Sequence, residues 1–458
     1  MIYSSTRGND IDLNFGEVLL NGLARDGGLY VPNRLKFYSE KELDSLRELD
    51  YPSLVFELTK DFVLDEISES EYKKICINSY NKSFGREIIS FDKIDQYKYI
   101  ANLFNGPTYA FKDFALQLLG NIYEYVLKKR KIKLTILGAT SGDTGSAAIH
   151  GCSKSDNVKI FILFPLNKVS EIQRKQMTTV KKKNVFNIAV KGNFDDCQRM
   201  VKNYFKFNNE NNNINLAAVN SINWVRIMGQ IVYYFWCYFR VTRKLEPLSF
   251  VVPTGNFGNA YAGYISKKMG LPIKKIIISS NKNDILTRFF KTGRMEIKKT
   301  LTSLSPSMDI QISSNFERLL FDFYENGKMI KKLFYRLENK KEFSIAESHL
   351  KKMRKTFGYG KLSDSETITT ISKIYNKYKL IIDPHTAVGI SVGEKELNNN
   401  EKRIYLATAH YSKFLKTVKE SVGKKINYPI KLEKILKKSE KFKVIENDLN
   451  QLKKLIKN

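Results

Sequence analysis

One lysine, Lys112, stands in a setting unlike that of most of the 77 Lys and Arg residues in the chain. It lies between two phenylalanines in GPTYAFKDFALQLL, residues 106–119, and apolar residues at helical spacing in 113–127 place it at a helix start. Apolar surroundings favour a neutral amine, which is a nucleophile that forms imines with aldehydes. The alternative is an ordinary helix-start lysine that pairs with Asp113.

Two glycine-rich loops share a second pattern. Residues 133–151 (KLTILGATSGDTGSAAIHG) and 249–265 (SFVVPTGNFGNAYAGYI) each run from strand through a Gly, Ser, Thr or Asn loop into a helix. Such a loop offers free N–H groups and a helix N-terminus to an anion such as phosphate, although a plain turn also needs glycine. Segment 138–145 lacks the P-loop lysine and 255–259 lacks the third glycine of a dinucleotide motif, which disfavours ATP and NAD. An imine-forming lysine with a phosphate loop suggests pyridoxal phosphate.

The composition of the chain argues against several other classes of protein. With 458 residues and 42% hydrophobic residues, the chain is expected to fold into two or three domains. It has no apolar run of membrane-spanning length and no signal-like start, so we expect a cytoplasmic protein without membrane contact. The four cysteines are far apart and histidines are few, so neither a disulfide framework nor a metal site is expected.

The net charge of +30 admits a nucleic-acid-binding protein as an alternative. The lysines are mixed with acidic residues, as in 431–441 (KLEKILKKSEK), and have no interleaved aromatic residues. We therefore expect a solvated surface and no nucleic-acid partner. For the oligomeric state, a monomer is slightly favoured.

The elements that must position these residues indicate an α/β fold. The first hundred residues are mainly helical in pattern, with Ser39 and Glu42, and Ser68 and Glu71, spaced as capping boxes. Short apolar runs then alternate with helical patterns, as in parallel sheets covered by helices. The predicted strands are 133–137, 158–164, 185–190, 249–253, 275–279 and 403–407.

Eight blocks along nearly the whole chain resemble the threonine synthases, which belong to the fold-type II pyridoxal-phosphate enzymes. The blocks are LLNGLARDGGLYVP (19–32), FNGPTYAFKDFALQLL (104–119), GATSGDTGSAA (138–148), NSINWVRIMGQIVYYF (220–235), VPTGNFGNAYAG (252–263), SPSMDI (305–310), DPHTAVG (383–389) and ATAHYSKF (407–414). The resemblance implies two α/β domains of largely parallel sheets flanked by helices, after a mainly helical N-terminal segment. We place these parts at 1–97, 98–220 (the smaller domain, with Lys112 and the 138–145 loop) and 221–458.

The resemblance also implies residue roles toward pyridoxal 5'-phosphate. Lys112 corresponds to the lysine that forms the imine with the cofactor, and Thr408 to the hydroxyl that faces the pyridine nitrogen. The phosphate loop corresponds to Gly255, Asn256, Phe257 and Gly258.

The implied enzyme is a lyase of threonine biosynthesis. It converts O-phospho-L-homoserine and water to L-threonine and phosphate by γ-elimination and β-addition of water. The residues that resemble the family's substrate contacts are Ser141, Gly142, Thr144, Ser221 and Arg226. A serine or threonine dehydratase is the alternative within the class, but it lacks the LARDGGLYVP block and needs no second phosphate site.

One departure from the family pattern lies beside Thr408. Residues 410–414 read HYSKF where H-P-A-K-F is more usual. Because proline fixes its own φ and restricts its neighbour, its loss is expected to hold Thr408 less rigidly.

Overall fold

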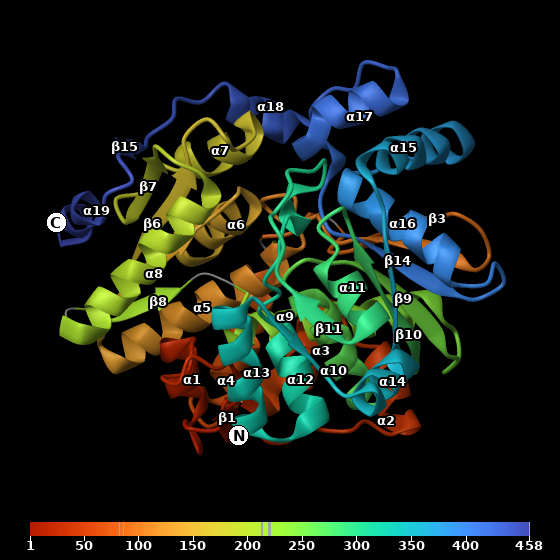
Figure 1. Cartoon of the computed structure of the whole chain (residues 1–458), viewed down its shortest axis with the longest axis horizontal. Helices are drawn as coiled ribbons and strands as arrows, with labels where there is room; N and C mark the ends of the chain where they lie inside the picture. Colours follow the sequence, from red (N-terminus) through yellow and green to blue (C-terminus); the bar gives the residue numbers. More distant parts are fainter. Residues whose placement is uncertain (82, 86, 212–213, 219–220, 458) are drawn as a thin grey trace.

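The computed structural model describes residues 1–81, 83–85, 87–211, 214–218 and 221–457, and two sheets organise the chain (Figure 1). In the six-stranded sheet every neighbouring pair is parallel except the β3–β4 pair at one edge. Its strands in spatial order are β13 (Phe357–Lys361), β10 (Ile273–Ser280), β9 (Leu248–Pro253), β14 (Arg403–Ala407), β4 (Lys98–Asn102) and β3 (Ser90–Lys93).

The five-stranded sheet is parallel throughout. Its order is β15 (Lys443–Ile445), β7 (Val185–Val190), β6 (Val158–Pro165), β5 (Leu134–Ala139) and β8 (Leu216–Ala218). The six strands predicted from apolar runs are confirmed as β5, β6, β7, β9, β10 and β14. Their runs of buried side chains reflect the helices that cover both faces of a parallel sheet.

Helix α5 (Lys112–Arg130) lies between α6 (Asp143–Cys152) and α9 (Trp224–Val241). The α5–α6 crossing depends on two glycines, because a Cβ on Gly120 would lie 2.0 Å from the carbonyl oxygen of Gly151. The backbones therefore meet directly, which leaves α5 little freedom to shift. Lys112 is the first residue of this clamped helix, as the apolar spacing predicts.

The N-terminal segment is mainly helical, with α1 (Phe15–Asn21), α2 (Glu40–Arg47), α3 (Tyr51–Val63), α4 (Glu69–Tyr80) and the strands β1 (Tyr3–Ser5) and β2 (Tyr30–Pro32). The capping box of Ser39 and Glu42 is confirmed. The second predicted box is wrong: Ser68 precedes α4 but makes no side-chain cap bond. The Glu71 carboxylate lies 2.6 Å from the Lys74 ammonium instead, and this ion pair competes with the cap.

The remaining elements include the helices that follow these strands and a separate two-stranded sheet of β11 and β12. They are α7 (Glu171–Thr178), α8 (Phe194–Asn211), α10 (Gly258–Lys268), α11 (Ile285–Thr292), β11 (Arg294–Glu296), η1 (Pro306–Met308), α12 (Phe316–Tyr324), α13 (Gly327–Lys340), β12 (Glu342–Ser344), α14 (Glu347–Thr356), α15 (Asp364–Tyr378), α16 (Pro384–Glu396), η2 (Tyr411–Phe414), α17 (Leu415–Val422), α18 (Ile430–Leu436) and α19 (Leu449–Lys457). Buried side chains of the N-terminal segment, α5, α9 and α10 form one continuous apolar cluster.

The sheets do not divide the chain into consecutive parts. Strand β4, at 98–102, belongs to the six-stranded sheet, and β15 near the C-terminus belongs to the five-stranded sheet. The division into 1–97, 98–220 and 221–458 remains our proposal, with these two strands crossing it; residue 220 lies outside the described residues.

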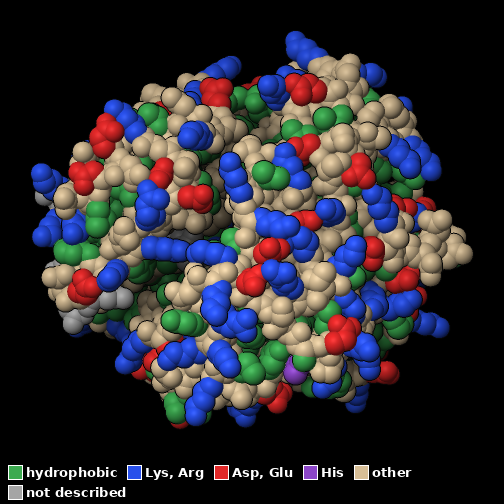
Figure 2. Space-filling view, in the orientation of Figure 1, with side chains coloured by type: hydrophobic (Ala, Val, Ile, Leu, Met, Phe, Trp, Pro, Cys, Tyr) green, Lys and Arg blue, Asp and Glu red, His purple; other side chains and the backbone are tan. Residues whose placement is uncertain are grey.

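Lys and Arg side chains are spread over the face shown in Figure 2 and are interspersed with Asp and Glu. They do not gather in a single patch on this face, in keeping with the solvated surface expected from the sequence. Within the described part of the chain, no helix is both long and apolar enough to span a membrane.

Candidate functional site

The Lys112 side chain is only 13% exposed, and its Nζ lies 3.6 Å from Oδ2 of Asp143. Burial lowers the pKa of Lys112, the carboxylate of Asp143 opposes this shift, and the charges of Lys413 and Arg226 lower the pKa further. The net direction is downward, toward the neutral amine expected from the sequence. A nearby carboxylate was not expected, however, and it works against that neutral form.

The alternative pairing of Lys112 with Asp113 is wrong. The Asp113 carboxylate turns back and accepts hydrogen bonds from the N–H of Thr108 at 2.8 Å and from its hydroxyl at 2.7 Å. These bonds close the turn that begins α5, so Asp113 fixes the approach to Lys112 and does not pair with it.

Asp143 is a meeting point of four elements. Besides Lys112, its carboxylate contacts Lys413 Nζ at 2.6 Å, Gln173 Nε2 at 2.8 Å and Ser307 Oγ at 3.3 Å. Burial alone would raise the pKa of Asp143, but Lys413 and Lys112 hold it below its usual range. Asp143 is therefore a buried anion that joins the helices around the small sheet to segments of the larger one.

The loop before α6 has a fixed shape. The hydroxyl of Thr140 accepts from the N–H groups of Gly142 and Gly145 at 3.0 and 2.9 Å. Gly142 has φ +139°, and a Cβ there would lie 2.7 Å from the Gln173 side chain, so only glycine fits. The predicted substrate residues Ser141, Gly142 and Thr144 thus flank Asp143, next to Lys112.

The loop between β9 and α10 has the form of an anion cradle. A Cβ on Gly255 would lie 2.8 Å from Ile310 Cδ1 and 3.2 Å from Met308 Cα, and Phe257 has φ +63° immediately before the helix. The first N–H groups of α10 have no helical acceptor and point out of the helix start. Loop 255–258 therefore fits a phosphate group held by backbone donors.

Residues 313–315 brace this loop and bring Ser221 to it. The N–H of Asn315 donates to the carbonyl of Asn256 at 3.0 Å, and its Nδ2 donates to the carbonyl of Ser221 at 3.0 Å. The hydroxyls of Ser221 and Ser314 lie 3.3 Å apart. The structure therefore joins Ser221 to the 255–258 loop.

Arg226, in the first turn of α9, is 3% exposed. Burial lowers its pKa to about 10, and its charge is among those that lower the pKa of Lys112. The predicted substrate arginine thus lies within electrostatic range of Lys112, on the helix that packs against α5.

Thr408 is 6% exposed and follows β14. Its carbonyl accepts from the N–H of Phe111 at 2.9 Å, and the N–H of His410 donates to the carbonyl of Tyr109 at 3.1 Å. A short antiparallel pairing therefore joins the ATAH block to the residues that directly precede Lys112.

Side-chain contacts hold the segment 410–414, where the usual proline is absent, and the looser hold on Thr408 stays a prediction. His410 Nδ1 lies 2.7 Å from the Ser412 hydroxyl and accepts from the Ser412 N–H at 3.3 Å. The His410 ring also packs edge-on against Phe104 and Tyr109. Serine and histidine thus constrain the turn where the proline is absent.

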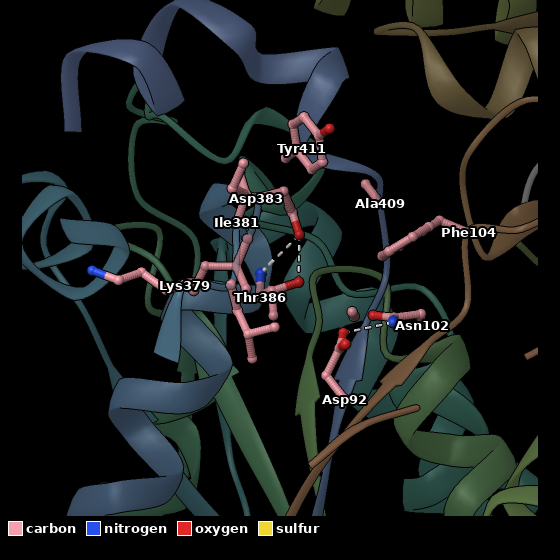
Figure 3. A pocket seen from close by; sticks show the side chains of 12 residues that line it. Asp92, Asn102, Phe104, Lys379, Ile381, Asp383, Thr386, Ala409 and Tyr411 are labelled. Atoms are coloured by element: carbon pink, nitrogen blue, oxygen red, sulfur yellow. Dashed lines mark hydrogen bonds between the residues drawn. The ribbon is translucent and has the colours of Figure 1, made fainter. Parts of the chain in front are cut away.

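A pocket of about 280 Å³ lies behind the same segment (Figure 3). Ala407 and Ala409 line it and Thr408 does not, because successive side chains of an extended segment point to opposite sides. Segment 407–409 is therefore a wall with this pocket on one side. The lining residues are Asp92, Asn102, Phe104, Lys379, Leu380, Ile381, Ile382, Asp383, Thr386, Ala407, Ala409 and Tyr411.

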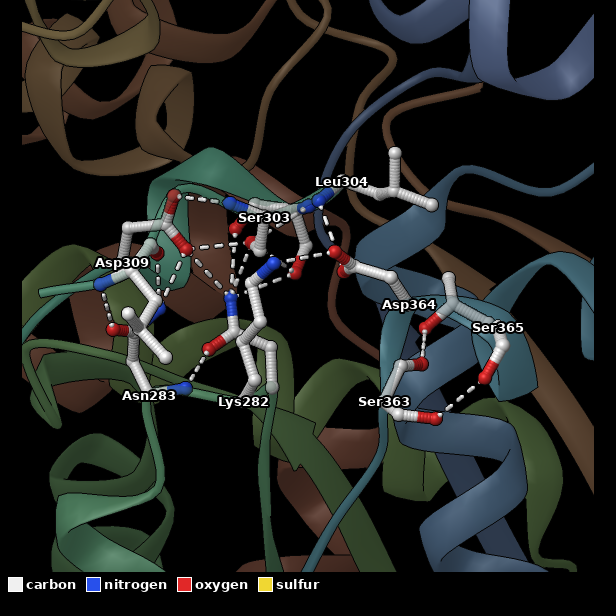
Figure 4. A network of polar contacts seen from close by, with 12 residues as sticks. Lys282, Asn283, Ser303, Leu304, Asp309, Ser363, Asp364 and Ser365 are labelled. Atoms are coloured by element: carbon white, nitrogen blue, oxygen red, sulfur yellow. Dashed lines mark hydrogen bonds and ion pairs between the residues drawn. The ribbon is translucent and has the colours of Figure 1, made fainter.

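A polar network holds the 303–309 segment in place (Figure 4). Asp309, whose pKa is raised by burial, accepts from the Asn281 and Asn283 amides, both at 2.9 Å. Lys282 pairs with Asp364 at 2.6 Å, and Asp364 accepts from the Leu304 N–H. The network fixes the segment that carries Ser307 and Met308. Ser307 contacts Asp143, and Met308 leaves no room for a side chain at position 255.

His385 also faces this segment. Its Nδ1 lies 2.7 Å from Asp383 Oδ1, and its Nε2 accepts from the N–H of Ser307 at 3.3 Å. Asp383 therefore sets the tautomer, and the DPHTAVG block meets the SPSMDI block at one hydrogen bond.

Sequence reasoning missed Asp143, Lys413, Ser307 and His385 as neighbours of the site. Asp143 stands between two residues that were singled out, and Lys413 stands inside the departing HYSKF block. For Asp143 and Lys413, the available signal was a charged residue inside a motif block.

Three family models match the chain in order. They are "Threonine synthase N terminus" over residues 2–80, "Pyridoxal-phosphate dependent enzyme" over 99–333 and "Threonine synthase, C-terminal" over 386–456. The middle model covers about half of the chain and includes both Lys112 and the 255–258 loop.

Full-length relatives agree with these models. The chain is 43% identical to a threonine synthase of Pseudomonas aeruginosa, over 100% of this chain and 98% of the relative. It superposes on a pyridoxal-phosphate-bound threonine synthase of Brucella melitensis with a TM-score of 0.96 and 40% identity, covering 100% and 98% of the two chains. A yeast threonine synthase structure gives a TM-score of 0.93 and 38% identity, covering 100% and 98%. The chain belongs to the threonine synthase family, the pyridoxal-phosphate-dependent lyases of fold type II.

Proposed function

We propose that the chain converts O-phospho-L-homoserine and water to L-threonine and inorganic phosphate at the site around Lys112. One observation carries this proposal: two loop-to-helix starts converge on Lys112. The 138–145 loop reaches it through Asp143, and the 255–258 loop reaches Asp143 through the 305–310 segment. A site for a phosphorylated substrate on a phosphorylated cofactor needs two such anion positions.

The residues fit pyridoxal phosphate. Gly255, Asn256, Phe257 and Gly258 would hold its phosphate with backbone donors, and Thr408 would offer a hydroxyl, not a carboxylate, to the pyridine nitrogen. Lys112, which is buried and has a lowered pKa, would be the residue that binds the cofactor covalently. When bound, the cofactor supplies an electron sink that stabilises negative charge on the substrate carbons.

Lys112 would also act as the base toward the substrate. Its neutral amine would take up and return the protons at the substrate Cα and Cβ, since a neutral amine is a general base. Because α5 packs between α6 and α9, the backbone of Lys112 is held in a fixed position. The same lysine thus serves binding and proton transfer.

The anionic ends of the substrate are assigned to a second group of residues, around the start of α6 and on α9. Ser141, Gly142 and Thr144 offer hydroxyl and backbone donors at the start of α6, and Ser221 and Arg226 add a hydroxyl and a guanidinium. A guanidinium donates bidentately to phosphate, and its burial strengthens that pairing.

Phosphate release tests this function. Purified holoenzyme with O-phospho-L-homoserine is expected to form phosphate and threonine in equal amounts. L-Threonine and L-serine, the substrates of the dehydratase alternative, are expected to give no oxo acid. Release of oxo acid without phosphate formation would establish the dehydratase alternative.

We also propose a cytoplasmic monomer. Four buried cysteines without a disulfide are typical of a reducing compartment. The contacts among Lys112, Asp143 and Lys413 are made within one chain. Light scattering of the purified protein tests the monomer.

A further inference from the structure

Lys413 is the most deeply buried charge next to Lys112. Its side chain has no exposed surface, and its Nζ donates to the Thr108 carbonyl at 2.7 Å and pairs with Asp143 Oδ1 at 2.6 Å. Two acceptors from different segments therefore fix this ammonium. It lies on η2, directly after the segment that carries Thr408.

Asp143 has one negative charge and two lysine neighbours. Lys413 approaches Oδ1 at 2.6 Å, whereas Lys112 remains 3.6 Å from Oδ2. A carboxylate within about 4–6 Å of a lone lysine stabilises the ammonium and raises its pKa by about 1–3. If Asp143 acted on Lys112 alone, it would keep that amine protonated and unable to react.

We propose that Lys413 is a positioning residue that neutralises Asp143, so that Lys112 gives up its proton to water although a carboxylate lies beside it. The carboxylate then orients Lys112 without trapping it as an ammonium ion. Asp143 in turn keeps its hydrogen bonds to Gln173 and Ser307 and so holds the two sides of the site together. The proposal rests on the proposed role of Lys112.

The charges around the pair support this assignment. Those that act on Lys112 are Asp143 from α6, Lys413 from η2 and Arg226 from α9, and the two cations both lower its pKa. Lys413 also acts on Asp113, whose pKa burial raises to about 6. The Asp113 carboxylate is bound by Thr108, and Lys413 forms its ion pair with Asp143.

Competitive acetylation of the full-length chain, stripped of cofactor, tests the proposal by measuring the protonation midpoint of Lys112. Trace acetic anhydride labels neutral amines only, and mass spectrometry of the Lys112 peptide from pH 6 to 11 gives a midpoint for this one lysine. In Lys413→Gln the midpoint is expected to rise by about one pH unit or more. In Lys413→Arg, which keeps the charge, it is expected to stay near the wild-type value.

A second variant acts on the same carboxylate in the opposite direction. Asp143→Asn removes the carboxylate that favours the ammonium form of Lys112, so the Lys112 midpoint is expected to fall. Lys98→Gln is the matched control: it removes a lysine paired with Glu394 at 2.9 Å, and the midpoint is expected to stay unchanged. Loss of packing alone would not move the two site variants in opposite directions.

An unchanged or lowered midpoint in a folded Lys413→Gln protein would overturn the proposal. If that variant does not fold, an unchanged or raised midpoint in Asp143→Asn overturns it equally. The labelling uses neither cofactor nor substrate, so its outcome is independent of phosphate release. In the holoenzyme, the acidic limb of the kcat–pH profile of Lys413→Gln is expected to shift upward as well.

Discussion

The main-chain N–H of Phe111 donates to the carbonyl of Thr408 at 2.9 Å, and the neighbouring Ala110 and Ala409 form an antiparallel bridge. Lys112 follows Phe111 directly. The lysine assigned to the covalent bond and the hydroxyl assigned to the pyridine nitrogen are therefore joined by backbone contacts. A shift of either segment moves both ends of the cofactor site together.

Lys112→Ala is expected to give a folded protein that no longer binds the cofactor covalently. Borohydride reduction followed by peptide mapping checks this, with the label on Lys112 in the wild type. Lys98→Gln serves as control and is expected to keep full labelling. Because Lys413 is held by Asp143 and Thr108, we expect no label on it, and label on Lys413 in either protein would disprove the assignment.

Gly255→Val is expected to weaken cofactor binding about tenfold or more, or ~1.4 kcal/mol, because its side chain would collide with Ile310 and Met308. Asn256→Ala is expected to have a smaller effect, since the loop binds mainly through its backbone. Fluorescence titration with cofactor measures both.

The control for the loop is Gly85→Val, where the Cβ meets only an ordinary contact at 3.8 Å. It is expected to bind cofactor like the wild type. Equal and negligible effects of the two loop variants would place the cofactor phosphate elsewhere.

Arg226→Ala is expected to lower kcat/KM about ten- to hundredfold, in line with about 1.5–3 kcal/mol for a lost charged hydrogen bond. Arg226→Lys is expected to recover only part of this, because an ammonium lacks the guanidinium fork. Phosphate release against substrate concentration gives the values, and absorbance reports cofactor occupancy.

Arg240→Ala, on the same helix with its guanidinium over the Trp236 ring, is the matched control and is expected to retain wild-type kcat/KM. Wild-type efficiency of Arg226→Ala would remove the arginine from the substrate site. An empty cofactor site in that variant would assign Arg226 to the cofactor instead.

The free energy of unfolding is expected to fall as the pH drops from 6.5 toward 4. Burial lowers the pKa of His410 to about 4, and that of His150 likewise, whereas an unfolded histidine titrates near pH 6.5. The unfolded chain therefore binds more protons in this window, which destabilises the fold by about 2 kcal/mol per histidine at pH 5.

Urea unfolding at pH 7.5 and pH 5 measures this loss in the wild type and in His410→Gln. The variant is expected to lose less stability between the two pH values, because it has one buried histidine fewer to protonate. Parallel losses in both proteins would contradict the assigned role of His410.

Local pattern was sufficient for six of the strands and for the helix start at Lys112. The runs that became β5, β6, β7, β9, β10 and β14 are apolar because both sheet faces are covered, and this signal lies within each run. Lys112 is recognisable because apolar neighbours and a helix start are local features as well.

The counter-charges of the site could not be predicted in this way. Asp143 and Lys413 belong to blocks far apart in the chain, and their contact follows from how β14 is placed beside β4 and how α6 crosses α5. The same holds for Ser307, which reaches Asp143 from a loop held by Asn281 and Asp309. Tertiary geometry, not residue spacing, creates these pairs.

The late strand β15 has a consequence for how the chain is made. Residues 443–445 pair with β7, and the N–H of Lys191 donates to the carbonyl of Ile445 at 3.0 Å. During translation, β5 to β8 leave the ribosome long before β15, so β7 remains an open sheet edge in the nascent chain until residues 443–445 are synthesised. Such an edge can pair with other chains, and β15 covers it once it has formed.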